Sequence, residues 1–422
     1  MKKVITYGTY DLLHFGHIRL LERAKALGDY LIVGITSDDY DMTRGKINNK
    51  QSLAERIAAV KETGLADEII VEEYEGQKID DIKRLSVDIF TVGSDWEGKF
   101  DYLKEYCQVV YLDRTEGVSS TEIRSEERKL KLEIGTEVPA LAEKFKKECS
   151  YVNGVEIVSK GEGDAIYLVS KPEKHYEQIK DLLNKKKHVL CESPIAIDDK
   201  QCKELFELAE KNNVVLMDAI KTAYGTAYSR LLLLIKTGKI GDVVSVDATC
   251  TSLSDNIEID YQNKWNSITA WGPTALLPIF QILGINYCEK NITTKYLDKD
   301  HKVDAFTKID FTYPNAVASI KVAKAAKSEG EMIITGTKGY IYVPAPWWKT
   351  DYFEVRFENR DENRRYFYQL DGEGIRYEAL AFVKACNHPS NNQKQWCISE
   401  EISVAISKVM KDFYDSKVNE IK

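Results

Sequence analysis

Short apolar runs alternate with amphipathic segments along the first 125 or so residues of the chain. Each run has the length and the Val, Ile and Tyr content of a buried strand, and the segments between the runs repeat apolar residues at helical spacing. We expect strands in VITYG, YLIVGIT, EIIVEE, DIFTVG and QVVYL, and helices near residues 17–27, 53–63 and 78–85. This alternation predicts one parallel sheet with crossover helices, a Rossmann-like α/β domain over residues 1–130.

The next segment, SEERKLKLEIGTEVPALAEKFKKE, is charged and helix-prone, and it holds Pro139, the first proline of the chain. We expect a domain boundary there. Beyond it, the runs VEIVS, DAIYLVS, HVLCESP and VVLMDAI predict a second, truncated Rossmann-like α/β unit over residues 131–242.

The pattern changes again at residue 243. The segments VVSVDATCTSL, AFTKIDFTYP, AVASIKVA, EMIITGTKGYIYVP and YFEVRFE alternate apolar and polar residues. Such alternation is typical of an antiparallel sheet with one packed and one wet face. We expect an open antiparallel sheet in an α+β domain over residues 243–422, closed by a helix near 399–416.

Composition narrows the classes of partner. The 59 Lys and Arg against 67 Asp and Glu leave a net charge of -8, which gives no global attraction to nucleic acid or to an anionic membrane. No apolar run approaches the length of a membrane span, LLLLI being the densest. The eight cysteines include no C-x-x-C pair, so we expect a reducing, cytoplasmic setting and no protein-bound metal site.

Two of the chain's six histidines, His14 and His17, fall where the first strand gives way to the first helix, in GTYDLLHFGH. Backbone N–H groups and the positive end of the helix dipole favour an anion at such a place. Gly8 and Gly16 carry no side chain that would block a phosphate chain. The imidazoles can donate hydrogen bonds to a phosphoryl group; the alternative is that they only cap the helix.

A second polar stretch, RTEGVSSTEIR at 114–124, follows the fifth strand and leads into a helix. Its arginine, hydroxyl groups and glycine offer donors to an anion. Ordinary helix capping by Ser or Thr explains the same composition equally well.

Together, GTYDLLHFGH, GSDWEGKFD and RTEGVSST resemble the HxGH nucleotidyltransferase superfamily and, within it, the CTP-dependent cytidylyltransferases that act on glycerol 3-phosphate. The resemblance implies that CTP binds with Mg²⁺, that a polyol phosphate attacks the α-phosphorus in line, and that pyrophosphate leaves. It also implies a homodimer and a CDP-activated polyol as product, used in cell-envelope polymers.

The same resemblance assigns roles to single residues. The catalytic residues would be His14, His17, Lys46 and Arg114. The nucleotide would be bound by Thr9, Tyr10, His14, His17, Lys46, Arg114, Thr115, Glu116, Gly117, Val118, Ser119, Ser120 and Thr121. The acceptor would be bound by Arg44, Arg56, Lys78, Asp95 and Trp96.

The later part of the chain resembles the Gfo/Idh/MocA oxidoreductases, through KHVLCESPIA, ITGTKGYIYVPAPWW and GIRYE among others. That family implies NAD(P), but departures in the dinucleotide-binding motif and at the catalytic positions speak against it. No G-x-G-x-x-G is found, GEGDAI at 161–166 being the best candidate, and the first βα unit looks missing or shortened. The family's Glu-Lys-Pro reads Glu192-Ser193-Pro194, and Thr274 stands near the expected catalytic histidine.

The expected function is therefore cytidylyl transfer to glycerol 3-phosphate or a related polyol phosphate, beside a degenerate oxidoreductase-like module. One alternative is a bifunctional enzyme that also reduces a keto-sugar phosphate with NAD(P)H. Another is a non-enzymatic nucleotide-binding scaffold. Lys221, in DAIKTAY, could hold a phosphate or lie solvated at a cleft rim.

Overall fold

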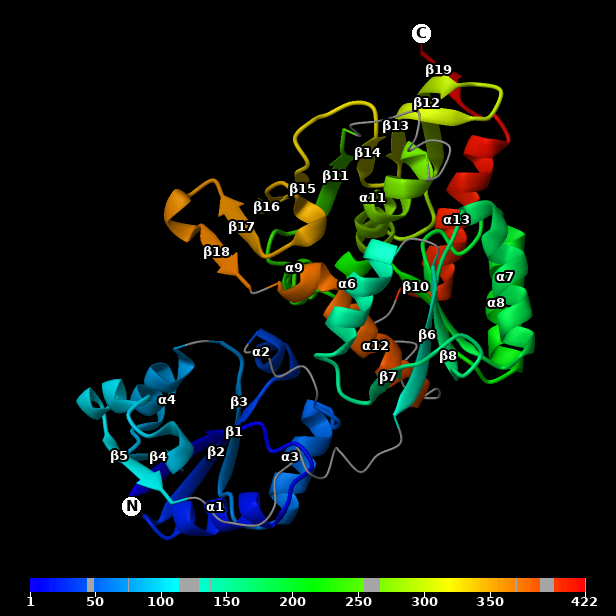
Figure 1. The fold of residues 1–422 in the computed structure, drawn as a ribbon. Coiled ribbons are helices and arrows are strands. Elements are labelled where there is room, and N and C mark those ends of the chain that lie inside the picture. The colour runs from blue at the N-terminus through cyan, green and yellow to red at the C-terminus, as the bar shows by residue number, and fades with distance from the viewer. Residues whose placement is uncertain are drawn as a thin grey trace. The chain divides into compact units, whose positions relative to one another are not determined.

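The computed structural model describes residues 1–43, 49–74, 76–113, 129–136, 139–253, 266–368, 370–387 and 398–421. The chain folds as two compact units, Met1–Arg128 and Lys129–Lys422 (Figure 1).

The first unit has a parallel sheet in the order β3-β2-β1-β4-β5. Its strands are β1 (Lys3–Gly8), β2 (Tyr30–Thr36), β3 (Glu68–Glu72), β4 (Ile89–Gly93) and β5 (Gln108–Leu112). Its helices are α1 (Phe15–Lys25), α2 (Asp38–Thr43), α3 (Leu53–Glu62) and α4 (Gln77–Leu85), with the short turns η1 (Ser94–Trp96) and η2 (Asp101–Glu105). The predicted Rossmann-like α/β fold is confirmed.

Alternate residues of β1 point to opposite faces of this sheet, as the two-residue period of a strand requires. Val4 joins an apolar cluster with α1 and α3, which includes Leu21 and Val60. Ile5 joins the cluster on the other face, with Ile82 of α4. The unit is thus a sheet covered by helices on both faces.

The second unit begins with another parallel sheet, in the order β10-β9-β8-β6-β7. Its strands are β6 (Leu130–Thr136), β7 (Val155–Ile157), β8 (Ala165–Val169), β9 (His188–Glu192) and β10 (Leu216–Ala219). Its helices are α6 (Pro139–Cys149), α7 (Pro172–Asn184) and α8 (Asp199–Lys211), and η3 (Lys221–Tyr224) and α9 (Thr226–Lys236) follow.

The strand β6 corrects the prediction of a helix-prone linker in this segment. Leu130 and Leu132 are buried while Lys131 between them is exposed, so the segment has the two-residue period of a strand. The buried carboxylate of Glu133 pairs with Lys187 at 2.5 Å. The charged residues that suggested a linker therefore belong to a strand, where their side chains are exposed or paired.

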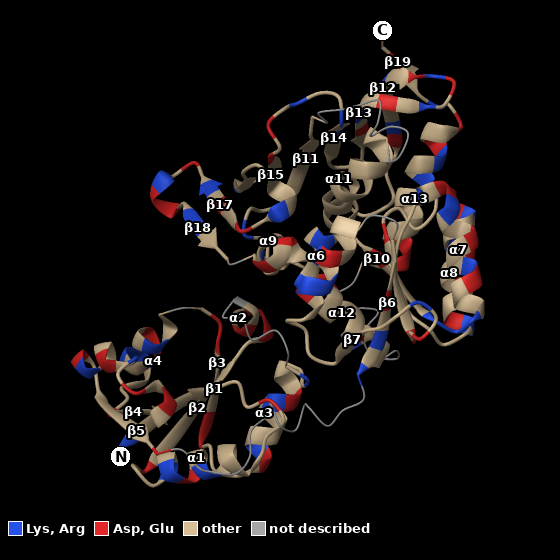
Figure 2. Ribbon diagram, viewed as in Figure 1, with Lys and Arg blue, Asp and Glu red and all other residues tan. Residues whose placement is uncertain are grey.

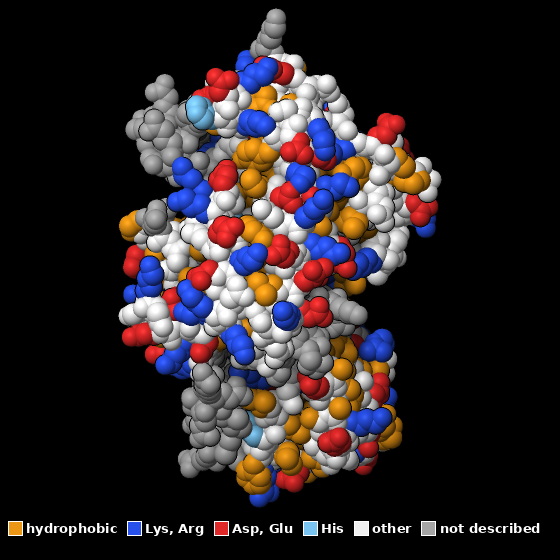
Figure 3. Space-filling model, turned by 90° about the vertical axis from the view of Figure 1, so that its right-hand side faces the viewer, with side chains coloured by type: hydrophobic (Ala, Val, Ile, Leu, Met, Phe, Trp, Pro, Cys, Tyr) orange, Lys and Arg blue, Asp and Glu red, His pale blue; other side chains and the backbone are white. Residues whose placement is uncertain are grey.

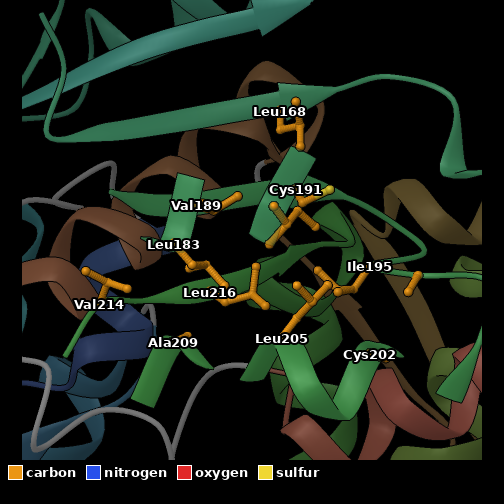
Figure 4. Packing of buried hydrophobic residues seen from close by; sticks show 12 residues of the cluster. Leu168, Leu183, Val189, Cys191, Ile195, Cys202, Leu205, Ala209, Val214 and Leu216 are labelled. Atoms are coloured by element: carbon orange, nitrogen blue, oxygen red, sulfur yellow. The ribbon is translucent and has the colours of Figure 1, made fainter. Parts of the chain in front are cut away.

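One face of this sheet carries α7 and α8 (Figure 1). Leu168, Val189, Cys191 and Leu216 of the sheet pack against side chains of these helices, Leu205 among them, in one apolar cluster (Figure 4). Acidic and basic residues are interspersed along both helices (Figure 2).

The last part of the chain forms a nine-stranded mixed sheet in the order β18-β17-β16-β15-β11-β14-β13-β12-β19 among the residues described. Neighbouring strands are antiparallel except for the pairs β11–β14 and β12–β19. The strands are β11 (Val243–Thr251), β12 (Glu289–Asp298), β13 (Val303–Thr312), β14 (Val317–Ala323), β15 (Met332–Gly336), β16 (Gly339–Val343), β17 (Tyr352–Phe357), β18 (Arg364–Phe367) and β19 (Asn419–Glu420).

This part of the chain also contains three long helices, α11 (Ser267–Leu283), α12 (Ile375–Asn387) and α13 (Glu400–Tyr414), with the turns η4 (Trp347–Lys349), η5 (Arg360–Glu362) and η6 (Asp371–Gly374). Of these helices, α12 packs against α6, and α13 packs against α8 and α11. α11 packs on β11, β13 and β14 although it contains Pro273 and Pro278. Prolines inside a helix remove hydrogen bonds, so burial of its many apolar residues must hold this helix together.

Within the described segments, no helix is both long and apolar enough to cross a membrane. Hydrophobic, basic and acidic side chains are mixed over the face of the molecule drawn in Figure 3. The described residues drawn there form no continuous basic surface of the kind that binds nucleic acid.

Candidate functional site

The candidate site lies at the carboxyl ends of β1 and β4 in the first unit. β2 and β3 lie on one side of β1, and β4 and β5 lie on the other, so the direction of the strand order reverses between β1 and β4. Open parallel sheets bind their ligands at such a reversal, beyond the carboxyl ends of the strands. The turn 9–14, which leads from β1 into α1, crosses this edge.

This turn is strained and firmly held. Tyr10 and Leu12 have left-handed backbone angles, with φ of 53° and 49°, and each such residue costs about 1–3 kcal/mol. The backbone N–H of Leu12 donates to Oε1 of Gln51 at 2.7 Å. The buried carboxylate of Asp11 accepts the N–H groups of Lys50 and Gln51 at 3.0 and 2.9 Å. The residues that precede α3 thus fix the turn.

The two histidines lie together at the start of α1. The His14 ring caps the helix, because its Nδ1 accepts the N–H of Gly16 at 3.1 Å. In the neutral ring the proton is therefore on Nε2, which can donate to a ligand. The His14 and His17 rings are stacked with centroids 3.9 Å apart, and the Tyr10 ring meets His17 edge-on at 5.5 Å.

The first turn of α1 contains no acidic residue. The positive end of the helix dipole is therefore not neutralised there, and it adds to the donors that the imidazoles offer. This combination suits a polyphosphate. Gly8 allows the Tyr10 ring to take its place beside the turn, because a Cβ at this position would lie 2.9 Å from that ring.

A fully buried carboxylate, Asp41 of α2, connects the ends of β1 and β2. Its Oδ1 accepts the hydroxyl of Thr9 at 3.1 Å. Its Oδ2 accepts the hydroxyl of Thr36 at 2.7 Å and the side-chain amide of Asn49 at 2.9 Å. Nη1 of Arg56 lies 3.6 Å from the same oxygen. The predicted nucleotide residue Thr9 is therefore held from inside the unit.

Arg56, expected to contact the acceptor, is 0 % exposed. Its Nη1 donates to the carbonyl oxygens of Thr9 and Thr36 at 2.7 and 2.9 Å, and its Nη2 pairs with Asp38. In this arrangement the guanidinium supports the turn from below and does not face solvent.

Lys78, also expected at the acceptor, is nearly buried in α4. Its ammonium lies 4.7 Å from the centroid of the Tyr7 ring and 5.5 Å from that of Phe100, and it pairs with the buried carboxylate of Glu72. The hydroxyl of Tyr7 donates to Asp81 at 2.9 Å, and burial, followed by the charge of Asp81, raises the pKa of that phenol. A cation held by rings and a carboxylate is ordered before a ligand arrives.

Asp95 and Trp96 form η1, directly after β4, so they lie at the same edge of the sheet. Trp96 is 37 % exposed, and its ring centroid is 5.9 Å from that of Phe100. Lys99 lies over the Trp96 ring at 4.9 Å. Since Lys78 also contacts Phe100, the structure brings Lys78 and Trp96 into one group of aromatic and cationic side chains.

The remaining predicted residues lie outside the described part of the chain. They are Arg44, Lys46, Arg114, Thr115, Glu116, Gly117, Val118, Ser119, Ser120 and Thr121.

Sequence reasoning missed Asp41 and Glu72, which hold Thr9 and Lys78 in place, and Asn49, which donates to Asp41. The segment Asp38-Asp39-Tyr40-Asp41 looks like an exposed acidic turn. Its position one turn after a strand end was the only available signal that one of these carboxylates serves the site.

In the second unit the first βα unit is present, which corrects the prediction that it is missing or shortened. β6 leads to α6 and then to β7. The truncation lies between β7 and β8, where residues 158–164 contain no helix. A dinucleotide fold has a second βα unit at this place.

The sequence between β6 and α6 departs from the dinucleotide-binding motif. It reads GTEVPA at 135–140, so a glutamate stands where the second glycine of the motif would let pyrophosphate approach. Pro139 opens α6 and offers no N–H. The segment GEGDAI at 161–166 runs into β8 and does not precede a helix.

Carboxyl groups gather at the ends of β9 and β10. Glu192 accepts the hydroxyl of Tyr167. Burial raises the pKa of Asp218 to about 7, although the hydroxyl of Ser403 donates to it at 2.8 Å. Burial, and then the charge of Glu192, raises the pKa of Glu378 well above its usual range. Ser193 follows Glu192, so no lysine stands at this position to serve as the family's proton donor.

The structure also locates Lys221 and Thr274, which sequence analysis singled out, and the nearby Tyr224. Tyr224 is buried, and its hydroxyl donates to the backbone carbonyl of Asp218 at 2.7 Å. Lys221 begins η3 and is partly exposed, and Thr274 lies within α11. Neither observation identifies a ligand for this unit.

Comparison with known proteins assigns the two units separately. A cytidylyltransferase-like family model matches residues 5–126, and a model of an oxidoreductase family with an NAD-binding Rossmann fold matches residues 118–219. Glycerol-3-phosphate cytidylyltransferase of Bacillus spizizenii is 51% identical over 126 residues, which are 30% of this chain and 97% of that protein. The Staphylococcus aureus enzyme is 48% identical over 126 residues, with 95% of its length covered.

Solved structures resemble the second unit. A 3-ketoreductase from Actinomadura kijaniata, crystallised with TDP-benzene and NADP, matches with a TM-score of 0.54 at 16% identity, over 70% of this chain and 99% of that chain. Levoglucosan dehydrogenase in complex with NADH and levoglucosan matches with a TM-score of 0.56 at 15% identity, over 68% and 97%. At such low identity these matches establish the fold of a Gfo/Idh/MocA module and nothing about its activity.

Proposed function

Because the chain belongs, through its first unit, to the glycerol-3-phosphate cytidylyltransferase family, we propose that it makes CDP-glycerol from CTP and glycerol 3-phosphate. The observation that carries this proposal is the pair of stacked imidazoles at the N-terminus of α1, at the reversal of strand order. Identity of about half over nearly the whole length of the relatives supports the substrate pair.

The proposed reaction is a single displacement. A phosphate oxygen of glycerol 3-phosphate forms a bond to the α-phosphorus of CTP, the bond from that phosphorus to the β-phosphate oxygen breaks, and pyrophosphate leaves. Nε2 of His14, whose Nδ1 is occupied by Gly16, donates to the triphosphate, and His17 acts beside it. Donors fixed where negative charge moves lower the barrier without a covalent intermediate.

Mg²⁺ is implied by the family. Among the described residues no three His, Cys, Asp or Glu side chains are arranged to hold a metal, and both oxygens of Asp11 already accept backbone N–H groups. The ion would therefore be carried by the phosphates of CTP, as is common for Mg²⁺. When bound, it would supply positive charge to the triphosphate.

On the acceptor side, we assign Lys78 to the phosphate of glycerol 3-phosphate, with Asp95, Trp96 and Arg44 near the glycerol. Lys78 is ordered by Tyr7 and Glu72 before the acceptor binds. Arg56 is assigned a supporting role, because it is buried beneath Thr9. Thr9, Tyr10, Lys46 and the segment 114–121 are assigned to the nucleotide. The assignments of Arg44, Lys46 and the segment 114–121 rest on the family resemblance alone.

The test is a pyrophosphate-release assay with CTP, ATP, GTP and UTP against glycerol 3-phosphate, other polyol phosphates and ethanolamine phosphate. We expect turnover with CTP and glycerol 3-phosphate only. Preference for another acceptor would keep cytidylyl transfer and replace the product, and absence of release with every pair would refute the proposal.

A second activity, reduction by NAD(P)H, is favoured only by the match of the second unit to an NAD-binding family. The turn at 135–140 and the missing crossover helix speak against it. We propose that this module no longer acts as an oxidoreductase, and fluorescence titration with NADH and NADPH should show no saturable binding at micromolar concentrations. We also propose a homodimer, to be tested by light scattering.

A further inference from the structure

We propose that Asp41 is a positioning residue of the nucleotide site, which holds the turn after β1 in the conformation that presents Thr9, Tyr10 and His17. The inference rests on the proposed function, since it names a further group that cytidylyl transfer needs. Asp41 lies in α2, outside the HxGH segment.

The contacts of Asp41 join three segments of the first unit. Its carboxylate, which is 0 % exposed, accepts donors from Thr9 after β1, from Thr36 at the end of β2, and from Asn49 shortly before α3. A single buried side chain thus fixes the relative positions of two strand ends and the approach to a helix. Buried acceptors that satisfy several donors make such junctions rigid.

Charge explains why a carboxylate is suited to this place. Arg56 is also 0 % exposed, and its Nη1 lies 3.6 Å from Oδ2 of Asp41. A buried guanidinium needs a paired anion, and a buried carboxylate needs a paired cation. The same Nη1 donates to the carbonyl oxygen of Thr9, so Thr9 is held twice, through its hydroxyl by Asp41 and through its carbonyl by Arg56.

The next residue, Tyr10, shows what depends on this arrangement. It has the left-handed φ of 53°, and its ring meets the ring of His17 at 5.5 Å. A strained residue keeps its conformation only when its neighbours over-determine it. Loss of Asp41 releases the hydroxyl of Thr9, and Tyr10 and His17 then lose their fixed places while the sheet and its helices stay formed.

The experiment compares Asp41→Ala with Val60→Ala in the full chain. Val60 is buried in α3, one turn beyond Arg56, and belongs to the apolar cluster that also includes Tyr10, so its truncation destabilises the unit but removes none of the hydrogen bonds that hold the turn. Pyrophosphate release gives kcat and KM for CTP and for glycerol 3-phosphate, and melting gives Tm. We expect Asp41→Ala to lower kcat/KM for CTP about 100-fold, because a displacement of about 1 Å has that effect. Val60→Ala should lower Tm and keep kcat/KM for CTP within about threefold.

A double-variant cycle tests whether Asp41 acts through Thr9. Thr9→Val should itself reduce kcat/KM, and Asp41→Ala added to it should reduce it by no more than about threefold further. Additive losses, or an Asp41→Ala enzyme whose kinetics match those of Val60→Ala, overturn the proposal. Asn49→Ala removes one donor to Asp41 and, unlike Thr36→Val, leaves the contact between the Thr36 and Thr9 hydroxyls in place. If Asp41→Ala does not fold, a selective loss of kcat/KM for CTP in Asn49→Ala supports the proposal, and unchanged kinetics overturn it.

The proposed function is tested separately, by pyrophosphate release from the wild-type protein. If the wild type releases no pyrophosphate with any pair of nucleotide and acceptor, the proposed function fails. The positioning role of Asp41 is then tested by calorimetric measurement of CTP binding. Weaker CTP binding in Asp41→Ala but not in Val60→Ala supports a positioning role. Equal binding in all three proteins, or no binding by the wild type, overturns it.

Discussion

The carboxyl of Asp218 gives the second unit a pH dependence that can be calculated. Asp218 is 2 % exposed, and burial raises its pKa from 3.8 to about 7, although the hydroxyl of Ser403 stabilises the anion. The charge of Glu192 adds to the rise. The folded protein therefore binds a proton here at pH values at which the unfolded chain has already released it.

The sign follows from this difference. Between the unfolded and the folded pKa the native state holds more protons, so the free energy of unfolding falls as pH rises. From pH 5 to pH 8 this one group should lower it by about 2–3 kcal/mol, at about 1.4 kcal/mol for each unit over which only the folded state is protonated. Asp218→Asn removes the titrating group, and its loss of stability over the same range should be smaller by that amount.

Urea unfolding at pH 5 and pH 8 measures the effect. Five of the six tryptophans, at positions 265, 271, 347, 348 and 396, lie in the second unit, so tryptophan fluorescence reports mainly on it. Asp361→Asn, at an exposed turn, is the matched control and should change as the wild type does. If Asp218→Asn and the wild type lose the same stability between the two pH values, the assignment of a buried, protonated carboxyl to Asp218 is wrong.

Three further predictions concern the first unit. His17→Ala should lower kcat for pyrophosphate release by about 1,000-fold with an unchanged Tm, because it removes a donor to the moving charge; near-normal kcat would contradict its role. Lys78→Met should raise KM for glycerol 3-phosphate at least about tenfold and leave KM for CTP within about twofold; equal effects on both substrates would move Lys78 away from the acceptor. Arg56→Lys should destabilise the first unit by about 2–4 kcal/mol in thermal or urea unfolding. An ammonium group cannot replace the guanidinium bonds to Thr9, Thr36 and Asp38 together. A Tm equal to that of the wild type would show that these buried bonds do not stabilise the unit.

The fold of the first unit could be predicted from sequence because its strands are short, apolar and regularly separated by helices. The five predicted strands all occur, with ends shifted by a residue or so. β6 could not be predicted in the same way, because LKLEIGT mixes charged and apolar residues and only its pairing with β8 decides its conformation. Tertiary pairing of this kind overrides local propensity.

The residues of the candidate site also differ in how far they could be predicted from sequence. His14 and His17 could be found because the motif lies within one turn of helix, and the structure stacks their rings. Asp41 and Glu72 could not, because their importance depends on tertiary contacts. Asp41 contacts Thr9, which is distant in the chain, and Glu72 on β3 pairs with Lys78 on α4. The burial of Arg56 could not be predicted either, because a single arginine usually lies at the surface.

The division of one chain into the units 1–128 and 129–422 has a consequence for stoichiometry. Each cytidylyltransferase unit is made together with one oxidoreductase-fold module, and dilution cannot separate the two as it would separate a complex of free subunits. The ratio of the two units is therefore one to one at every protein concentration.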